Sequence, residues 1–283
     1  MKALVTGATG FVGQHIVAAL LSRGHHVTVA SRSRERLQAC PWQDAVSWVP
    51  REIGAGRRFA LPGDDLPEVL IHAAWSNLHD YRSLVPLEEL LLPHYFFIKQ
   101  LVTAGVSRCV VTGTCLEYGL QEGALAETDA AAPVVPYAIA KNVLRQMLLG
   151  LQTSHPFRLQ WLRLFYLHGE GQRPSSLLAQ LEQALERSDE VFDMSPGDQQ
   201  RDYLPVTEAA RLICRLAENT DYDGIVNCCS GKPVAVADLV RRHAAARGKS
   251  LQLNLGRYDY PDYEPRHFWG DVTLLHQLTG PQQ

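Results

Sequence analysis

The sequence contains no long hydrophobic run: none of its 283 residues lies in a stretch of the roughly 18 apolar residues that a membrane-spanning helix needs. The opening residues, MKALVTGATG, hold only a short apolar run, so we expect no signal peptide. Neither sign of charge dominates, since 27 Lys and Arg stand against 30 Asp and Glu, a net charge of -3. We therefore expect neither a membrane partner nor a nucleic-acid partner.

The sequence also lacks any C-x-x-C pair of cysteines, which argues against a zinc site or a thioredoxin-type redox site. The six cysteines are Cys40, Cys109, Cys115, Cys214, Cys228 and Cys229. Several lie in apolar runs, which is typical of buried, reduced thiols. We predict no bound metal and a cytoplasmic location.

Lysine is scarce: it accounts for only five of the 27 basic residues, and the other 22 are arginine. Arginine binds phosphate and carboxylate groups with two parallel hydrogen bonds, so the excess is compatible with anionic ligands. A codon bias of the source genome explains the excess equally well. The arginines therefore need to be judged one by one.

Short apolar runs alternate with helical patterns in the first part of the chain. Strands are expected at 2–6, 26–31, 46–49, 68–73, 108–112 and 158–165. Helices are expected at 11–23, 87–104 and 136–152. This alternation is typical of a parallel sheet with helices on both faces. The predicted fold is an α/β, Rossmann-type doubly wound parallel sheet.

The rhythm changes after about residue 168. Helices are expected at 177–187, 207–218 and 236–247, with a strand near 224–228 and loop-rich chain up to Asp202. The segment 255–270 is rich in Tyr, Pro and Arg, and irregular segments of this kind often close over a site. We predict a nucleotide-binding domain at 1–168 and a smaller substrate-binding lobe at 169–283, partly interleaved with the first.

A glycine-rich loop, TGATGFVG, connects the first expected strand to the first expected helix. Gly7 permits a sharp turn, Gly10 lets backbone N–H groups approach a pyrophosphate, and Gly13 permits close packing of helix on strand. The helix N-terminus adds partial positive charge. We predict a dinucleotide site that also includes Thr9, Phe11 and Val12.

The end of the second strand indicates which dinucleotide binds. NAD-binding proteins usually carry an acid there, which holds the ribose hydroxyls. Ser31 and Arg32 stand at this place, with Arg34 and Arg36 close by. A cation without an acid favours the 2′-phosphate of NADP(H), although NAD(H) remains possible and the arginines can equally be a solvated cluster at a helix start.

Together these motifs resemble the extended branch of the short-chain dehydrogenase/reductase family, which includes NAD(P)-dependent sugar-nucleotide epimerases, dehydratases and reductases. The resemblance covers nearly the whole chain. Its other segments are IHAAW at 71–75, TGTCLEYG at 112–119, YAIAK at 137–141, RLFYLHG at 163–169 and RDYLPV at 201–206. It implies that Ala73 and Ala74 lie beneath the cofactor.

The family's Y-x-x-x-K motif is Tyr137 and Lys141, which share one face of a helix that Pro136 starts. A free tyrosine has a pKa of about 10, and we expect the ammonium of Lys141 and a cationic nicotinamide to lower it. Tyr137 then serves as general acid/base. The resemblance implies that Lys141 also binds the nicotinamide ribose and that Thr114 hydrogen-bonds the substrate oxygen.

Several reactions are open to the family. Its 4,6-dehydratases carry Asp-Glu directly after the catalytic Thr, where this chain has Cys115 and Leu116, so dehydration is disfavoured. Glu117 is expected to point elsewhere. The leading hypothesis is an NADP(H)-dependent 4-ketoreductase of a sugar nucleotide, with an NAD-dependent 4-epimerase as the alternative. A cofactor-sensing regulator is a third, against which the retained Tyr and Lys argue.

For the substrate, the resemblance implies that Arg201 and Arg266 bind the diphosphate of a sugar nucleotide. Each can instead be a surface residue or pair with a nearby acid. Tyr166 stands where the family has a substrate-contacting Asn, so the pocket is expected to differ. Trp75 and His79 are candidates to line the sugar pocket, with packing as the alternative for both. Family members commonly form homodimers through the helices expected here at 87–104 and 136–152.

Overall fold

The computed structural model describes residues 1–50, 52–54, 66–76, 78 and 80–280. Its centre is a seven-stranded sheet in the order β11-β7-β5-β4-β1-β2-β3, and every neighbouring pair is parallel. The strands are β1 (Lys2–Thr6), β2 (His26–Ser31), β3 (Ser47–Pro50), β4 (Val69–His72), β5 (Arg108–Thr114), β7 (Arg158–Leu164) and β11 (Gly224–Cys228). The predicted doubly wound α/β fold is confirmed.

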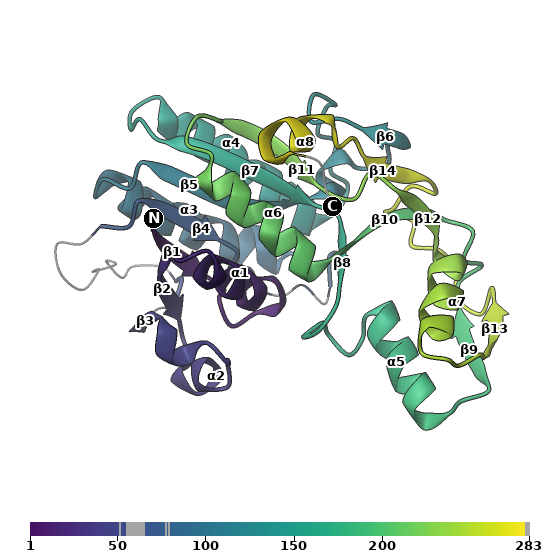
Figure 1. Cartoon of the computed structure of the whole chain (residues 1–283). Helices are drawn as coiled ribbons and strands as arrows, with labels where there is room; N and C mark the ends of the chain where they lie inside the picture. Colours follow the sequence, from purple (N-terminus) through teal and green to yellow (C-terminus); the bar gives the residue numbers. More distant parts are fainter. Residues whose placement is uncertain (51, 55–65, 77, 79, 281–283) are drawn as a thin grey trace.

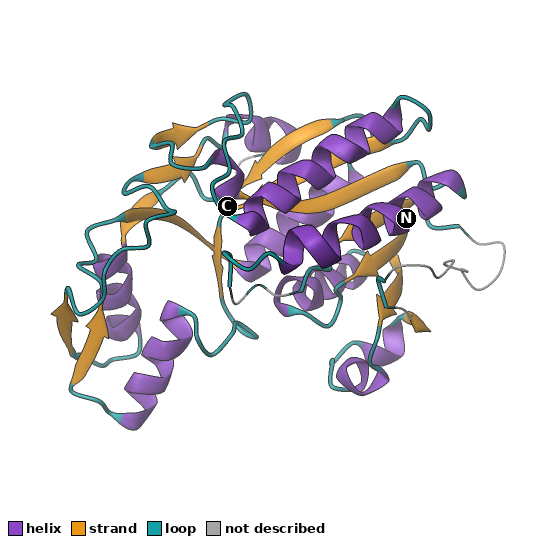
Figure 2. Ribbon diagram, turned by 180° about the vertical axis from the view of Figure 1, so that it is seen from behind, coloured by secondary structure: helices purple, strands orange, loops and turns teal. Residues whose placement is uncertain are grey.

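Helices cover both faces of the sheet (Figures 1 and 2). One face carries α1 (Phe11–Ser22), α6 (Val206–Glu218) and α8 (Thr273–Thr279). The other carries α3 (Leu91–Thr103) and α4 (Pro136–Gln152). The alternation of side chains along a strand explains the two layers: Ala3 and Val5 of β1 pack toward α1, and Leu4 packs toward α3 and α4.

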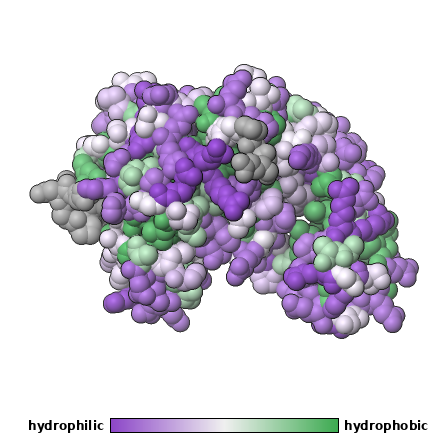
Figure 3. Space-filling model, viewed as in Figure 1, coloured by the Kyte–Doolittle hydropathy of each residue, from purple (hydrophilic) through white to green (hydrophobic). Residues whose placement is uncertain are grey.

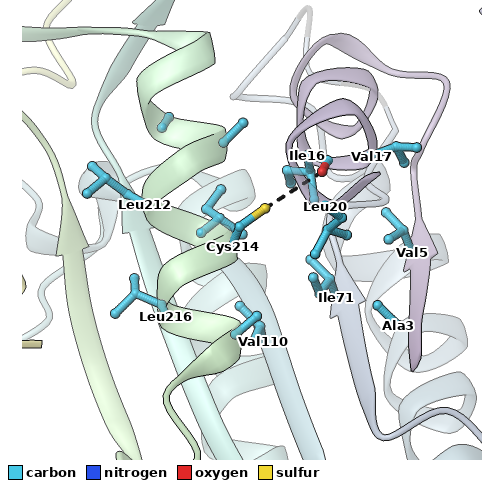
Figure 4. Packing of buried hydrophobic residues seen from close by; sticks show 14 of the residues in the cluster. Ala3, Val5, Ile16, Val17, Leu20, Ile71, Val110, Leu212, Cys214 and Leu216 are labelled. Carbon is cyan, nitrogen blue, oxygen red and sulfur yellow. Dashed lines mark hydrogen bonds between the residues drawn. The ribbon is translucent and has the colours of Figure 1, made fainter. Parts of the chain in front are cut away.

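The packing of α1 against α6 illustrates how the first layer is filled (Figure 4). Ile16 and Leu20 of α1 and Leu212 of α6 are fully or almost fully buried there. The thiol of Cys214 donates a hydrogen bond to the carbonyl of Ile16, at 3.7 Å. All six cysteines are buried thiols outside any disulfide, so cysteine serves here as a small apolar residue.

The helix expected at 87–104 is present, but its first turn is not α-helical. A single π-helical turn, η2 (Pro86–Leu90), precedes α3. Pro93 has no N–H to donate to the carbonyl four residues earlier, and this accounts for a change of hydrogen-bond pattern at this point. The wider turn lies beside the cavity described below.

A smaller lobe projects from the main body, and Figure 3 shows a hollow between the two. The lobe contains α5 (Leu177–Arg187) and α7 (Val236–Ala246), packed on the parallel pair β9 (Val191–Met194) and β13 (Gln252–Leu255). A three-stranded sheet, β8 (Tyr166–His168), β10 (Gln200–Pro205) and β12 (Pro233–Ala235), joins it to the body.

The chain crosses between body and lobe more than once, since α6 and β11 return to the main sheet. The division at residue 168 stays a prediction. The expectation of loop-rich chain up to Asp202 was wrong, because β9 and β10 lie there. Short elements also went unpredicted: α2 (Arg34–Gln38), η1 (Gln43–Ala45), η3 (Cys115–Tyr118), and the pair β6 (Gly123–Leu125) and β14 (Phe268–Gly270). Among the described residues, every helix is too short or too polar to cross a bilayer.

Candidate active site

The glycine-rich loop lies at the carboxyl end of β1, where glycine is required for close backbone contacts. Gly7 has a φ of +68°, and a Cβ there would lie 2.7 Å from the backbone of Ala73 and Ala74. A Cβ on Gly13 would lie 2.0 Å from the carbonyl oxygen of Gly7. Gly10 precedes α1 and provides no side-chain cap, so the first N–H groups of α1 stay available to an anion.

A cavity of about 420 Å³ opens beside this loop at the carboxyl ends of β1, β2 and β4. The predicted cofactor residues that line it are Gly7, Thr9, Gly10, Ser31, Arg32 and Ala74, and Trp75 joins them. Phe11, Val12, Gly13 and Ala73 are not among the lining residues. The lining also includes residues that the sequence did not single out as ligands: Ala30, Ser33, Arg36, Glu52, Ile53, Ser76, Leu90 and His94. Its position and backbone donors fit a dinucleotide.

The far end of the cavity holds both signs of charge. Arg32 lies 3.4 Å from Glu52, and both side chains are exposed. Ser33 caps α2 by accepting a hydrogen bond from the backbone of Arg36, at 3.1 Å. The sequence shows a cation without an acid at the end of β2, but the fold supplies an acid from the end of β3. The acid could have been predicted from the sequence, because neighbouring parallel strands end at the same edge of a sheet.

Thr114, Tyr137 and Lys141 are brought together as predicted, by the end of β5 and the first turns of α4. The side chain of Thr114 lies close enough to the phenol of Tyr137 to favour its ionised form. The ammonium of Lys141 donates to the carbonyl of Thr112, at 2.7 Å. The ring of Tyr137 stacks on that of Tyr81, with centroids 5.1 Å apart.

Burial shifts the pKa values of this pair toward the neutral forms. It raises the pKa of Tyr137 well above its usual range, aided by the proximity of Tyr81 and Glu117 and opposed by the neighbouring Thr114 side chain. Burial also lowers the pKa of Lys141 to about 7. The expectation that Lys141 lowers the pKa of Tyr137 is therefore not met by the protein alone. The lysine is itself desolvated, and its hydrogen bond goes to Thr112.

Trp75 belongs to the cofactor side of this set. Its ring lies 4.1 Å from the ammonium of Lys141 and stacks on His94, with centroids 4.5 Å apart. It lines the dinucleotide cavity, whereas the sequence suggested the sugar pocket. The other candidate for that pocket, His79, lies outside the described residues.

Glu117, three residues after Thr114, points into the protein as expected. Its carboxylate accepts hydrogen bonds from the backbone of Thr114 at 2.9 Å and from the indole of Trp161 at 2.9 and 3.1 Å. It also pairs with Arg163, at 3.2 Å. Both charged side chains are almost fully buried. Glu117 thus fixes the end of β5 to β7.

The two predicted phosphate-binding arginines have protein partners. Arg201 is buried, forms an ion pair with Glu264 at 3.1 Å, and donates to the carbonyl of Arg266 at 3.0 Å. Arg266 is half exposed and lies over the ring of Tyr260, 3.9 Å from its centroid. Both Nη atoms of Arg201 are thus bonded to protein groups, so a phosphate that binds them has to displace one of these partners.

Aromatic side chains separate Arg201 from solvent. Its guanidinium lies 4.9 Å from the ring centroid of Phe268 and 5.8 Å from that of Tyr166. Tyr166 also packs against Tyr203. The C-terminal segment covers the site as predicted, because Tyr263 packs into the cluster that contains Tyr137.

Comparison with known proteins settles the family. Residues 3–229 match the model of the NAD dependent epimerase/dehydratase family. The chain belongs to this family. The resemblance to extended short-chain dehydrogenases/reductases is thereby confirmed, and with it the Rossmann-type, NAD-dependent character of the enzyme. The family match supports an enzyme of the sugar-nucleotide epimerase, dehydratase and reductase group. Its chemistry is of the oxidoreductase type.

Named relatives carry several activities. The chain is 27% identical to dTDP-6-deoxy-L-talose 4-dehydrogenase (NAD(+)) of Aggregatibacter actinomycetemcomitans, covering 95% of this chain and 99% of the relative. It is 25% identical to GDP-6-deoxy-D-mannose reductase of Pseudomonas aeruginosa, covering 99% and 91%. Proteins named as 4-epimerases also match. Among solved structures, MoeE5 in complex with UDP-glucuronic acid and NAD superimposes with a TM-score of 0.82 at 24% identity, covering 99% of this chain and 93% of that one.

We expect Glu117→Gln to lower the free energy of unfolding by about 3 kcal/mol, because it leaves the buried Arg163 without its counter-charge. Denaturant titration measures the loss, with the exposed Glu186→Gln as the matched control. Turnover lost while the free energy of unfolding is unchanged would instead make Glu117 a catalytic acid.

Lys141 gives a pH-dependent prediction for the cofactor-free protein. Its pKa is about 7 in the folded chain and near 10.5 when unfolded, so between these values the unfolded state binds the extra proton. The stability of the wild type, relative to Lys141→Met, should therefore rise as the pH increases from 7 to about 10. Denaturant titrations across this range test it; a difference that stays constant with pH refutes the lowered pKa.

Proposed function

We propose that this protein is an NADP(H)-dependent reductase of a nucleotide-linked 4-keto-6-deoxyhexose. The observation that carries the proposal is the buried set of Thr114, Tyr137 and Lys141 beside the dinucleotide cavity. Such a set needs only a hydride donor and a ketone to perform carbonyl reduction. The related 4-dehydrogenase and the related reductase, both named for 6-deoxy sugars, support this choice.

The residues present fit a dinucleotide. The loop at Gly7–Gly10 and the open start of α1 would hold the pyrophosphate, and Lys141 would hold the nicotinamide ribose. When bound, the reduced nicotinamide supplies a hydride to the ketone carbon. Arg32 and Arg36 would bind the 2′-phosphate of NADP(H).

In the proposed reaction the carbon gains the hydride and the carbonyl oxygen gains a proton from Tyr137. Thr114 holds the same oxygen through its hydroxyl. Burial keeps Tyr137 protonated and so ready to donate. Lys141 near neutrality can then return a proton to the phenolate.

The substrate's diphosphate is proposed to bind Arg201 and Arg266. Arg266 is half exposed, and it can reach the diphosphate by leaving the ring of Tyr260 and its exposed ion pair with Asp198, at 3.5 Å. Arg201 accepts the diphosphate by exchanging one anion, Glu264, for another. The exchange keeps Arg201 paired, and the displaced carboxylate of Glu264 has to move toward solvent to keep its charge hydrated.

An NAD-dependent 4-epimerase is the second candidate. Glu52 favours it, because an acid beside Arg32 can bind the ribose hydroxyls of NAD. The relatives named as 4-epimerases point the same way. Dehydration stays disfavoured, since Cys115 and Leu116 are buried apolar residues without a carboxylate.

The test is NADPH or NADH oxidation by the purified protein with 4-keto-6-deoxy sugar nucleotides. We expect turnover, and a higher kcat/KM with NADPH than with NADH. A preference for NADH would show that Glu52, not Arg32, determines the cofactor. Interconversion of sugar nucleotides without net cofactor consumption would establish the epimerase instead.

Tyr137→Phe should reduce kcat by about a hundredfold or more while dinucleotide affinity is retained, because only the proton donor is lost. Isothermal titration with NADPH serves as the control for folding. Full activity in this variant would remove Tyr137 from the mechanism.

We further propose a cytoplasmic homodimer that uses α3 and α4. Leu92 and Phe96 of α3 are about half exposed, and Leu149 of α4 is partly exposed, an uncommon amount of open apolar surface on neighbouring helices. Sedimentation velocity should give a dimer that Phe96→Glu dissociates. A monomeric wild type would contradict the proposal.

A further inference from the structure

His94 lies one turn after the π-helical turn η2, at the point where α3 meets the dinucleotide cavity. Its side chain is almost fully buried, with only 4% of the residue exposed. One face of the ring stacks on Trp75. The catalytic set described above does not use this residue.

His94 ends a chain of buried hydrogen bonds that starts at the sheet. The backbone N–H of Ala74 donates to the hydroxyl oxygen of Thr6, at 3.4 Å. That hydroxyl is 2.9 Å from Nδ1 of His72. Nε2 of His72 is 2.8 Å from Nδ1 of His94. Both histidines and the threonine are buried.

The positions of the protons in this chain follow from counting donors. If Thr6 donates its hydroxyl hydrogen to Nδ1 of His72, then Nε2 of His72 carries the proton and donates to Nδ1 of His94. Every donor up to that point has an acceptor. Nδ1 of His94 is then unprotonated, so in the neutral ring Nε2 of His94 bears the hydrogen.

The reverse arrangement leaves a buried donor unpaired. His72 would then donate from Nδ1 to Thr6, and the hydroxyl hydrogen of Thr6 would need another acceptor. Among the described residues, Thr6 has hydrogen bonds from its side chain only to His72 and Ala74, and the latter is a donor. An unmade hydrogen bond of a buried hydroxyl is costly, so the first arrangement is favoured.

Both rings are neutral at ordinary pH. Burial, together with the charge of Lys141, lowers the pKa of His94 to about 3. Burial likewise lowers the pKa of His72, with contributions from His94 and Lys141. The order of protons is therefore not disturbed by titration of the rings.

We propose that the Nε2–H group of His94 is a hydrogen-bond donor to an oxygen of the bound dinucleotide, either in its pyrophosphate or in a ribose. Within the described part of the chain, Nε2 has no hydrogen-bond partner, and the residue lines the cavity. α3 lies on the opposite face of the sheet from α1, so His94 and the start of α1 approach the cavity from two sides. The inference rests on the proposed function only in requiring a dinucleotide.

Two variants separate this role from a purely structural one. The amide of Asn overlaps the position of Nδ1, so His94→Asn keeps the bond to His72 and loses the donor to the cavity. The amide of Gln reaches the position of Nε2, so His94→Gln does the opposite. We expect the dissociation constant of NADPH or NADH to rise about tenfold in His94→Asn and by much less in His94→Gln.

Fluorescence titration gives these dissociation constants, and thermal unfolding of the free proteins gives the structural effect. If His94 had only a structural role, His94→Gln would weaken dinucleotide binding more than His94→Asn, because it loses the hydrogen bond to His72. Binding by His94→Asn equal to the wild type overturns the proposal. Titration with ADP-ribose and with 5′-AMP distinguishes the acceptor: a loss with both indicates the adenosine side, and a loss with ADP-ribose alone indicates the distal phosphate or ribose.

The wild type supplies an independent test, should a variant fail to fold. Long-range ¹H–¹⁵N correlation spectra of the histidine rings should show Nε2–H tautomers for His72 and His94, and an Nδ1–H tautomer at His94 overturns the inference. Failure of the proposed function is distinct. A protein that binds dinucleotide but reduces no keto sugar leaves the role of His94 intact, and one that binds no dinucleotide ends both.

Discussion

The arrangement of the active site depends on one buried carboxylate. Glu117 binds the backbone N–H of the residue that carries the catalytic hydroxyl, Thr114, and reaches Trp161 and Arg163 on the next strand. A Cβ on Gly113 would lie 2.5 Å from that carboxylate, so glycine is needed for the contact. Since Thr114 lies beside the phenol of Tyr137, Glu117 sets where the catalytic hydroxyl stands relative to that phenol. An acid that looks catalytic in the sequence thus acts by holding a strand end in place.

Burial and chemistry make opposite demands on the rest of the site. Tyr137 and Lys141 are both desolvated, and each is driven toward its neutral form. The face of Trp75 and the carbonyl of Thr112 partly replace water around the ammonium. A lysine with a pKa of about 7 exchanges protons readily at neutral pH, whereas a solvated lysine does not. The desolvation that is unfavourable for folding therefore prepares the group for proton transfer.

Sequence reasoning succeeded where a local pattern carried the information. The strands at Lys2–Thr6 and His26–Ser31 and the helix at Pro136–Gln152 were predicted at their observed bounds, because apolar runs, glycine and proline mark them. The Thr-Tyr-Lys set followed from the resemblance to the family's motifs, with Tyr137 and Lys141 placed on one helix face by their spacing. His94 and Glu264 were missed because their roles depend on elements far apart in the chain, whereas Glu52 follows a strand parallel to β2 and was open to prediction. No local signal tells that Glu264 reaches Arg201, which lies 63 residues earlier, on β10.

The buried cations show how these parts fit together. Three cationic side chains are buried in the described residues: Arg163, Arg201 and Lys141. Arg163 is neutralised by Glu117 and Arg201 by Glu264. Among the described residues, the ammonium of Lys141 contacts only the carbonyl of Thr112 and the ring of Trp75, and neither carries a negative charge. The charge of Lys141 can therefore still be balanced by an incoming anionic group. A phenolate forming at Tyr137 during proton donation is such a group. Lys141, the buried cation without a carboxylate partner in the described residues, thus lies beside Tyr137, where negative charge develops in the proposed reaction.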